Sequence, residues 1–262
     1  MPIVHAIVLG ITQGLSEFLP ISSSGHLVLV PWLFQWEELT RNPDLNRTFD
    51  VALHIGTFVG AFAYFWGDVW RLVTGNRRMA GLLLLSSFPA AGVGVLLDSF
   101  HFDAVWLIGV MLIVFGLVLR WADSLAGTRF EGEFGPREAL LMGVAQAAAL
   151  QPGVSRSGAT ISMGRYLGFG RDAAARLSFL MSLPIIGGAG AYEGAKVFVG
   201  GEGIPAGFGP AFFWGMLAAG LTGFVAVWGL LKVIRTRSFT PFVNYRIALG
   251  IAVLVIAATP WR

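Results

Sequence analysis

Long apolar stretches dominate the chain, and their lengths separate two kinds of segment. A helix that crosses roughly 30 Å of hydrocarbon needs about 20 predominantly apolar residues, at about 1.5 Å each. Stretches close to this length predict membrane spans near residues 50–67, 79–98, 104–122, 174–196, 210–233 and 242–259. The sequence therefore predicts an all-α polytopic membrane protein with six transmembrane helices.

Two further apolar stretches are too short to cross, and polar residues interrupt each of them. Residues 3–36 break at Pro20 and a run of serines, and residues 139–168 break at the segment QPGVSRSG. Irregular backbone at membrane depth persists only where protein or a water-filled cavity covers it. Each stretch is therefore predicted to form a re-entrant helix hairpin with a broken tip.

The two halves of the chain follow the same plan, a broken hairpin followed by three spans. Residues 1–122 and 139–262 are therefore predicted to be repeats within a single membrane domain that covers 1–262. An odd number of spans makes the repeats inverted, an architecture that commonly frames a binding site near the midplane. Identical residues recur at an offset of about 133, in the pairs Gly10/Gly143, Gln13/Gln146, Ser22/Ser155, Ser24/Ser157 and Gly25/Gly158. A second register near 128 aligns Gly60, Ala61, Ala63 and Tyr64 with Gly188, Ala189, Ala191 and Tyr192.

Basic residues are distributed unevenly between the two sides of this topology. One side carries Arg71, Arg77, Arg78, Arg129, Arg137, Arg171, Lys232, Arg235 and Arg237. The other carries Arg41, Arg47, Lys196 and Arg262. The positive-inside rule places the first group in the cytoplasm, with both termini on the outer, periplasmic side.

Composition agrees with this class and excludes several others. Hydrophobic residues make up 55% of the chain and charged residues 13%. The net charge of +3 is small and lacks basic blocks, so no nucleic-acid partner is expected. The absence of cysteine excludes disulfides and thiolate metal sites. The first residues lack the basic region of a cleaved signal peptide, so the N-terminus is expected to be retained.

The two hairpin tips present serines where a second helix begins, and this pattern favours anion binding. A serine at a helix N-cap accepts from free backbone N–H groups, and the remaining N–H groups and the helix dipole attract an anion. Two such ends suit a diphosphate. Arg156 adds a permanently charged fork that matches phosphate oxygens. The hydroxyls predicted to contact the substrate are those of Ser22, Ser24, Ser155, Ser157 and Thr160.

The first tip also carries ionisable groups, which mark a functional site when they lie at membrane depth. Gln13 and Glu17 are four residues apart and share one face of a helix. Glu17 either orients His26 or helps Gln13 to hold a divalent ion, and His26 acts as a base or as the nucleophile. A structural alternative pairs Glu17 with Arg156.

Three other ionisable residues are given structural roles. His54, in FDVALHIGTF, has no polar companion at metal-ligand spacing and is expected in the core or behind the site. Arg165 and Arg246 are expected to extend to lipid headgroups. The sequence contains none of the HExxH, GxxxxGK[ST] or GxGxxG motifs, which excludes zincin, P-loop and Rossmann interpretations.

The order and spacing of four segments resemble the undecaprenyl-diphosphate phosphatase family of the bacitracin-resistance type. These segments are QGLSEFLPISSSGH (13–26), FDVALHIGT (49–57), PGVSRSGAT (152–160) and RLSFLMSLP (176–184). The resemblance implies hydrolysis of undecaprenyl diphosphate in the bacterial inner membrane, which recycles the lipid carrier for cell-wall synthesis. It also implies a divalent cation, Mg²⁺ or Ca²⁺, a site that opens towards the outer side, and functional roles for Glu17, His26, Ser23 and Arg156. Gln13 stands at a position that accepts Glu or Gln, which puts a two-carboxylate metal site in doubt. Gln13 is therefore expected to contact the substrate or a metal, with Glu17 as the essential acid.

Two other functions remain to be weighed against a phosphatase of this family. A lipid-phosphate flippase or transporter would use the same anion-binding helix ends without a nucleophile. The type-2 phosphatidic-acid phosphatases share a Ser-Gly-His element and a Ser-Arg pair, but Ser162 stands where their later histidine is required. The sequence leaves open whether Ser23, His26 or water attacks phosphorus, and whether the chain forms a homodimer.

Overall fold

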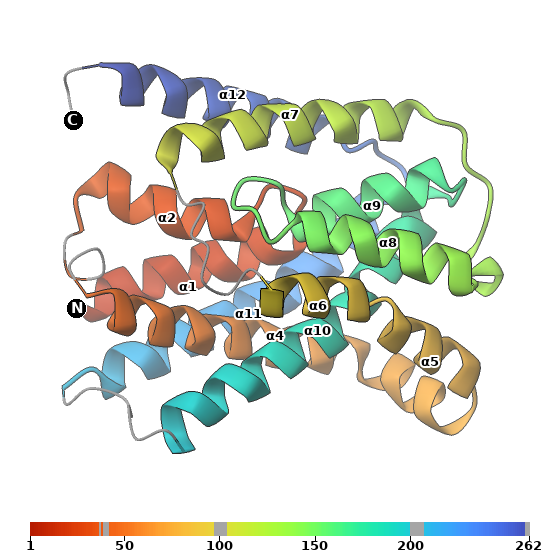
Figure 1. Cartoon of the computed structure of the whole chain (residues 1–262), viewed down its shortest axis with the longest axis horizontal. Helices are drawn as coiled ribbons and strands as arrows, with labels where there is room; N and C mark the ends of the chain where they lie inside the picture. Colours follow the sequence, from red (N-terminus) through yellow and green to blue (C-terminus); the bar gives the residue numbers. More distant parts are fainter. Residues whose placement is uncertain (37, 39–41, 97–103, 200–206, 260–262) are drawn as a thin grey trace.

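The structure, a computed structural model, describes residues 1–36, 38, 42–96, 104–199 and 207–259, which form a bundle of α-helices (Figure 1). Six helical segments in these ranges are long and apolar enough to cross a membrane, so the predicted class of multi-pass helical membrane protein is confirmed. They are α4 (Pro43–Thr74), α5 (Arg77–Leu85) together with α6 (Phe88–Leu96), α7 (Val105–Ser124), α10 (Arg171–Val199), α11 (Gly209–Ile234) and α12 (Thr240–Ala258). The shorter helices are α1 (Ile3–Phe18), α2 (Ser23–Phe34), η1 (Glu131–Glu133), α8 (Pro136–Ala148) and α9 (Arg156–Tyr166). The predicted span end at 98, Arg41 and Arg262 lie outside the described residues.

Helix starts follow local capping signals rather than the edges of the apolar stretches. Helix α4 begins at Pro43, where the side chain of Asn42 accepts from the N–H of Leu45 at 3.1 Å. Proline suits the first turn because its missing N–H would have no helical partner there. The helix continues to Thr74, so it is longer at both ends than the predicted span 50–67.

The second predicted span, 79–98, is interrupted between α5 and α6. Pro89 stands in the first turn of α6, and its ring is incompatible with a continuous helix through the preceding residues. The hydroxyl of Ser86 donates back to the carbonyl of Leu83 at 2.7 Å. The interruption frees the carbonyl of Ser86, which accepts from Nε2 of Gln146 on α8 at 3.4 Å.

Both short first helices pack closely against a neighbour through glycine. A Cβ added to Gly10 of α1 would lie 2.2 Å from the carbonyl oxygen of Gly215 on α11. A Cβ added to Gly143 of α8 would lie 2.5 Å from the carbonyl oxygen of Ser86, at the α5–α6 break. Small residues permit this backbone approach, which is typical of helix packing in membranes.

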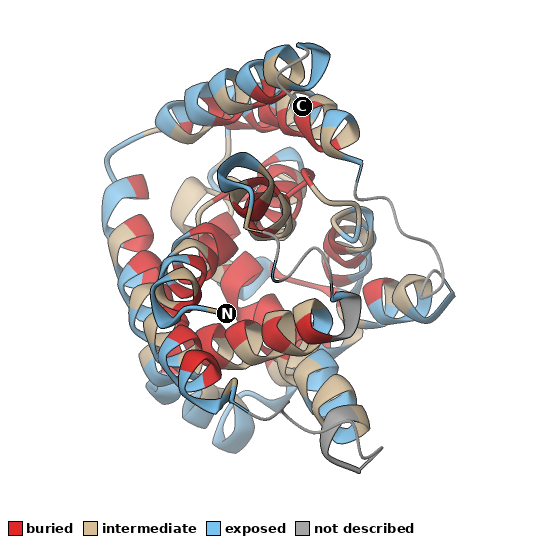
Figure 2. Ribbon diagram, turned by 90° about the vertical axis from the view of Figure 1, so that its left-hand side faces the viewer, coloured by how far each residue is buried: buried red, intermediate tan, exposed pale blue. Residues whose placement is uncertain are grey.

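The helix pairs α1–α2 and α8–α9 enter the bundle from opposite ends (Figure 1). The chain reverses near the middle of the bundle in both pairs, and α7 and α12 lie together along one side. The start of α1 and the end of α12 lie at the same end. Buried residues gather toward the centre of the bundle, whereas exposed residues face outward (Figure 2). Many of the exposed residues are large and apolar, including Trp70, Leu221 and Val255, as a lipid-facing surface requires.

Candidate active site

The residue that precedes the second helix has a positive φ in both chain breaks. Ser22 precedes α2 with φ 78°, and Ser155 precedes α9 with φ 72°. Positive φ is uncommon for residues other than glycine, and it occurs where the surroundings enforce it. Each serine caps its helix, since Ser22 Oγ accepts from the N–H of Gly25 at 3.4 Å and Ser155 Oγ from that of Gly158 at 3.1 Å. The serines predicted as N-caps therefore are N-caps.

Hydrogen bonds join the two breaks to each other. The Oγ atom of Ser22 accepts from the N–H of Gly153 at 3.1 Å, and the hydroxyl of Ser157 donates to the carbonyl of Leu19 at 3.1 Å. Residues more than 130 positions apart in the chain are thus fixed against each other. The two helix N-termini that follow the breaks are held as one unit.

Arg246 of α12 completes this junction from the side. Its guanidinium donates to the carbonyls of Pro20 (3.2 Å), Gly153 (2.8 Å), Val154 (2.9 Å) and Leu112 (3.2 Å). Its exposed fraction is 0%, so the expectation that it extends to headgroups is wrong. These carbonyl oxygens provide the hydrogen bonds that a buried guanidinium requires.

The carboxylate of Glu17 is the centre of a polar cluster at the tip of the first hairpin. Its Oε2 accepts from Ser23 Oγ at 2.6 Å and from Gln13 Nε2 at 2.9 Å. Its Oε1 forms an ion pair with Nη2 of Arg156, and Nε2 of His54 lies 3.7 Å from Oε2. The Glu17 side chain is only 2% exposed, whereas Arg156 is 21% and His54 34% exposed. The cluster is therefore closed around Glu17 and open at Arg156 and His54.

This arrangement suits the activation of a hydroxyl beside a bound anion. A carboxylate that accepts the hydrogen bond of Ser23 is positioned to take its proton, because a general base must lie within hydrogen-bond reach. Ser23 and Arg156 are the first residues of α2 and α9, so free backbone N–H groups lie beside both side chains. The pairing of Glu17 with Arg156, the structural alternative, is also present.

His26 is held apart from this cluster. Its Nδ1 lies 2.7 Å from the carbonyl oxygen of Ser22, and its Nε2 lies 2.7 Å from the hydroxyl of Tyr245 on α12. The carbonyl can only accept, so Nδ1 carries the hydrogen and Nε2 of the neutral ring accepts from the tyrosine. Ser22 and Tyr245, rather than Glu17, orient His26.

The remaining residues predicted to contact the substrate differ in the hydrogen bonds that already engage their side chains. Thr160 is buried, its hydroxyl donates to the carbonyl of Arg156 at 2.8 Å, and it lies 2.6 Å from the hydroxyl of Ser178. The hydroxyls of Ser155 and Ser157 are 3.3 Å apart. Ser24 lies in the first turn of α2 and is partly buried. Thr160 thus supports the backbone behind Arg156, and the serines line the junction of the two breaks.

Sequence reasoning missed two residues next to the predicted groups, His54 and Tyr245. His54 was expected in the core or behind the site, and it stands at the open edge of the Glu17 cluster. Its position in a polar-poor segment gave no local signal, because its partner belongs to a different helix. Tyr245 had a weak signal, a tyrosine beside a charged residue within an apolar span.

The residues predicted to bind metal, Gln13 and Glu17, suit a divalent cation that phosphate oxygens of a substrate would also coordinate. Oε1 of Gln13 is buried and has no hydrogen-bond partner among the described residues, and Nε2 of the same amide donates to the Glu17 carboxylate. Oxygen ligands suit Mg²⁺ and Ca²⁺, and Mg²⁺ is often held by one or two carboxylates and substrate phosphates. In the described part of the chain no three His, Cys, Asp or Glu residues gather as a complete site.

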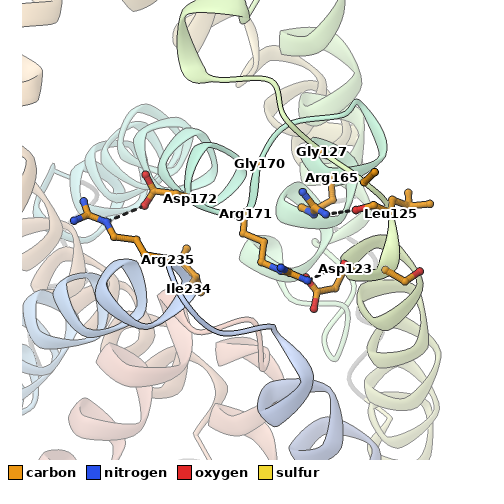
Figure 3. A pocket seen from close by; sticks show the side chains of 11 residues that line it. Asp123, Leu125, Gly127, Arg165, Gly170, Arg171, Asp172, Ile234 and Arg235 are labelled. Atoms are coloured by element: carbon orange, nitrogen blue, oxygen red, sulfur yellow. Dashed lines mark hydrogen bonds and ion pairs between the residues drawn. The ribbon is translucent and has the colours of Figure 1, made fainter.

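A cavity of about 520 Å³ lies at the far end of α9 from Arg156 (Figure 3). Its arginines are committed to neighbouring groups, as the dashed lines of Figure 3 indicate. Arg171 pairs with Asp123 at 2.5 Å and Arg235 with Asp172 at 3.5 Å. The cavity is thus lined by ion pairs.

Arg165 at this cavity is also buried rather than extended to headgroups. It is 4% exposed and donates to the carbonyls of Phe169, at 2.6 Å, and of Leu125. These carbonyls belong to the connections that follow α9 and α7. The expectation of a headgroup contact is wrong here for the same reason as at Arg246, since backbone acceptors are within reach.

The sequence matches the family of the bacitracin resistance protein BacA over residues 6–252. A relative from Pelotomaculum thermopropionicum, named undecaprenyl-diphosphatase, is 44% identical over 98% of both chains. Relatives of the same name from a Nocardioides species and from Geobacter sulfurreducens are 42% and 43% identical, over 98% and 97% of this chain and 97% and 98% of theirs. The chain belongs to the BacA family of bacitracin resistance proteins.

Proposed function

We propose that this protein is a membrane phosphatase that hydrolyses undecaprenyl diphosphate to undecaprenyl phosphate and inorganic phosphate. The names of its relatives support this substrate, and the product would return the lipid carrier to cell-wall synthesis. The observation that carries the proposal is the contact of Glu17 with both Ser23 and Arg156. A base, a hydroxyl and a phosphate-binding cation meet there at two helix N-termini.

In the proposed mechanism, Arg156 and the backbone N–H groups of α2 and α9 hold the diphosphate. The hydroxyl oxygen of Ser23 attacks the terminal phosphorus while its proton passes to Glu17. The bond to the bridging oxygen breaks, and this oxygen leaves with the electron pair as part of undecaprenyl phosphate. The proton on Glu17 is lost to water before the second step. Water then attacks the phosphoserine, and Glu17 accepts a proton from that water. Glu17 passes this proton to the Ser23 oxygen as the bond between phosphorus and that oxygen breaks. Positioned charge usually contributes most to such catalysis.

His26 has a supporting role in this scheme. Both of its ring nitrogens are already engaged, by the Ser22 carbonyl and the Tyr245 hydroxyl. It therefore fixes the backbone that precedes Ser23 and connects it to α12. Trapping a phosphorylated residue tests this assignment, since phosphate on His26 would replace Ser23 as the nucleophile.

Gln13 and Glu17 are the residues that would hold a divalent cation. A bound Mg²⁺ or Ca²⁺ would neutralise charge on the phosphate oxygens. The free Oε1 of Gln13 supports this assignment. Gln13 also donates to Glu17, which fixes the carboxylate for its contact with Ser23.

We further propose that the chain is an inverted repeat with two re-entrant hairpins in the bacterial cytoplasmic membrane, and that the site and both termini face the outer side. The similar positive φ angles of Ser22 and Ser155 support the duplication. The opposite entry of the two hairpins supports the inversion (Figure 1). The distribution of basic residues supports the orientation. The homodimer stays a prediction.

Phosphate release from undecaprenyl diphosphate by the purified protein in detergent tests the function. Substitution Glu17→Gln keeps the size of the side chain but removes the base, so we expect turnover to fall about 10³-fold. Leu150→Gln changes the corresponding position of the second hairpin and serves as the control with wild-type activity. Wild-type turnover in Glu17→Gln would refute the proposed mechanism, and no turnover by the unmodified protein would refute the function.

A flippase is the second candidate, because the opposed hairpins resemble the architecture of many transporters. It predicts movement of undecaprenyl phosphate between the leaflets of a liposome without release of phosphate. Flux that survives Glu17→Gln would assign transport to the chain, whereas absence of flux in active protein leaves hydrolysis alone.

A further inference from the structure

The peptide unit between Ser22 and Ser23 has a carbonyl that is held and an N–H that points the opposite way. A trans peptide directs its carbonyl and its N–H to opposite sides of the chain, and this peptide bond is trans. The N–H belongs to Ser23, the first residue of α2, where backbone N–H groups have no helical partner. It is therefore one of the donors that hold the phosphoryl group in the proposed mechanism.

The surroundings of Ser22 enforce an unfavourable backbone conformation. Its φ of 78° and ψ of 93° are sparsely populated by residues other than glycine, so the conformation persists only where contacts hold it. Its Oγ accepts from the N–H groups of Gly25 and Gly153. Its carbonyl accepts from the backbone N–H of His26 at 3.2 Å and, at 2.7 Å, from Nδ1 of the same residue. The histidine ring thus makes the shortest contact to the carbonyl that fixes this peptide unit.

The second break lacks this side-chain contact. The carbonyl of Ser155 accepts from the backbone N–H of Ala159 at 2.9 Å. Ala159 occupies the position equivalent to His26, about 133 residues later, and its methyl group cannot donate. The imidazole contact is therefore an addition at the tip that carries Ser23.

Tyr245 of α12 holds the histidine ring in place. Its hydroxyl lies 2.7 Å from Nε2 of His26, and the two rings are nearly parallel, at 9°. His26 is buried and both of its nitrogens are engaged, so rotation of the ring would break both hydrogen bonds. The next residue, Arg246, donates to the carbonyls of Pro20 and Gly153, which fixes this part of α12 against the two breaks. The tyrosine hydroxyl therefore has a defined position relative to α2.

We propose that Tyr245 is a positioning residue for the reaction. Through the His26 ring it fixes the Ser22–Ser23 peptide unit, whose N–H is then directed at the charge that develops on the phosphoryl oxygens. The inference rests on the proposed function, since it assigns an orientation to one of the donors of that site. Donors aimed at developing charge act mainly in the transition state, so Tyr245 should influence kcat more than KM.

Removal of the hydroxyl alone tests this inference. Tyr245→Phe keeps the aromatic ring, and we expect kcat for undecaprenyl diphosphate hydrolysis to fall about tenfold with little change in KM. Tyr166→Phe removes a hydroxyl at the far end of α9 and should keep wild-type kcat and KM. Thermal unfolding of both variants in detergent shows whether each is folded at the assay temperature.

A double variant separates an effect through His26 from a direct effect on the substrate. His26→Ala should lower kcat at least as far as Tyr245→Phe, and adding Tyr245→Phe to it should lower kcat no further. Losses that multiply in the double variant would overturn the inference, because the hydroxyl would then act without the ring. Unchanged kcat in folded Tyr245→Phe would overturn it as well.

His26→Asn provides a second test if Tyr245→Phe does not fold. Its amide can donate to the Ser22 carbonyl from the position of Nδ1, so this variant should retain a higher kcat than His26→Ala, at similar KM. Equal kcat in the two variants would overturn the inference, because the contact with the Ser22 carbonyl would then have no catalytic effect. An inactive wild-type protein would instead refute the proposed function, so the two failures are distinguishable.

Discussion

The two helix pairs share a serine N-cap at their breaks but differ in chemistry. Ser23 and Arg156 occupy equivalent positions, as the first residues of α2 and α9 and about 133 residues apart. Both side chains contact the one carboxylate of Glu17, whose counterpart in the second hairpin is Leu150. Two similarly capped helix N-termini therefore carry different groups, a hydroxyl beside a carboxylate at one and a cation at the other.

The two glutamines at equivalent sequence positions, Gln13 and Gln146, make different contacts. Nε2 of Gln13 donates to Glu17, whereas Nε2 of Gln146 donates to the carbonyl that the α5–α6 break leaves free at Ser86. Both residues are buried, and in both Oε1 has no hydrogen-bond partner among the described residues. The same residue is thus part of the proposed reaction centre in one half and a helix-packing contact in the other.

The largest expected effects come from removing the side chain that each of the two helix N-termini brings to Glu17. Ser23→Ala should lower kcat about 10³-fold with little change in KM, because it removes the proposed nucleophile but not the phosphate contact. Arg156→Ala should lower kcat about 10²-fold and also raise KM, since its charge acts in both the bound state and the transition state. Steady-state phosphate release separates the two patterns. Equal changes of KM in both variants would contradict the division of labour.

A smaller effect, on stability, is expected from the side chain that joins the two hairpins. Arg246→Met removes the guanidinium that donates to the carbonyls of Pro20, Gly153 and Val154. The variant should be destabilised by about 3 kcal/mol, because buried carbonyls lose their partners. Thermal unfolding in detergent measures this change. Arg246→Lys should recover part of the loss, because an ammonium restores the charge but not all of the hydrogen bonds. A melting temperature unchanged in Arg246→Met would show that the junction holds without it.

Local signals explain why much of the site was predictable. The apolar runs before Pro20 and after Ala139 are too short to cross, and the serines that follow each break are good N-caps. The two helix breaks and the N-caps Ser22 and Ser155 were therefore readable from the chain. The interruption at Pro89 had a signal too, but one that an apolar window of 20 residues conceals. These features depend only on neighbouring residues.

Contacts between distant helices account for what was missed. The approach of His54 to Glu17 depends on how α4 is rotated against α1, which no periodicity in either helix specifies. A sequence likewise does not distinguish an arginine that reaches a headgroup from one that is enclosed by carbonyls, as Arg246 is. The carbonyls that enclose Arg246 come together where the two chain breaks meet, and this meeting exists only in the folded protein.

The smallest expected difference is in the stability lost when alanine replaces Gly10 or Gly143. Gly10→Ala would bring a Cβ to 2.2 Å from the carbonyl of Gly215, inside the continuous helix α11, and Gly143→Ala to 2.5 Å from that of Ser86. Both should destabilise, by about 1–3 kcal/mol. Gly143→Ala should be the milder, because the α5–α6 break has no continuous helical hydrogen bonding to lose when it shifts. Thermal unfolding of both variants under one condition decides this, and a larger loss for Gly143→Ala would mean that the break is the more rigid of the two surfaces.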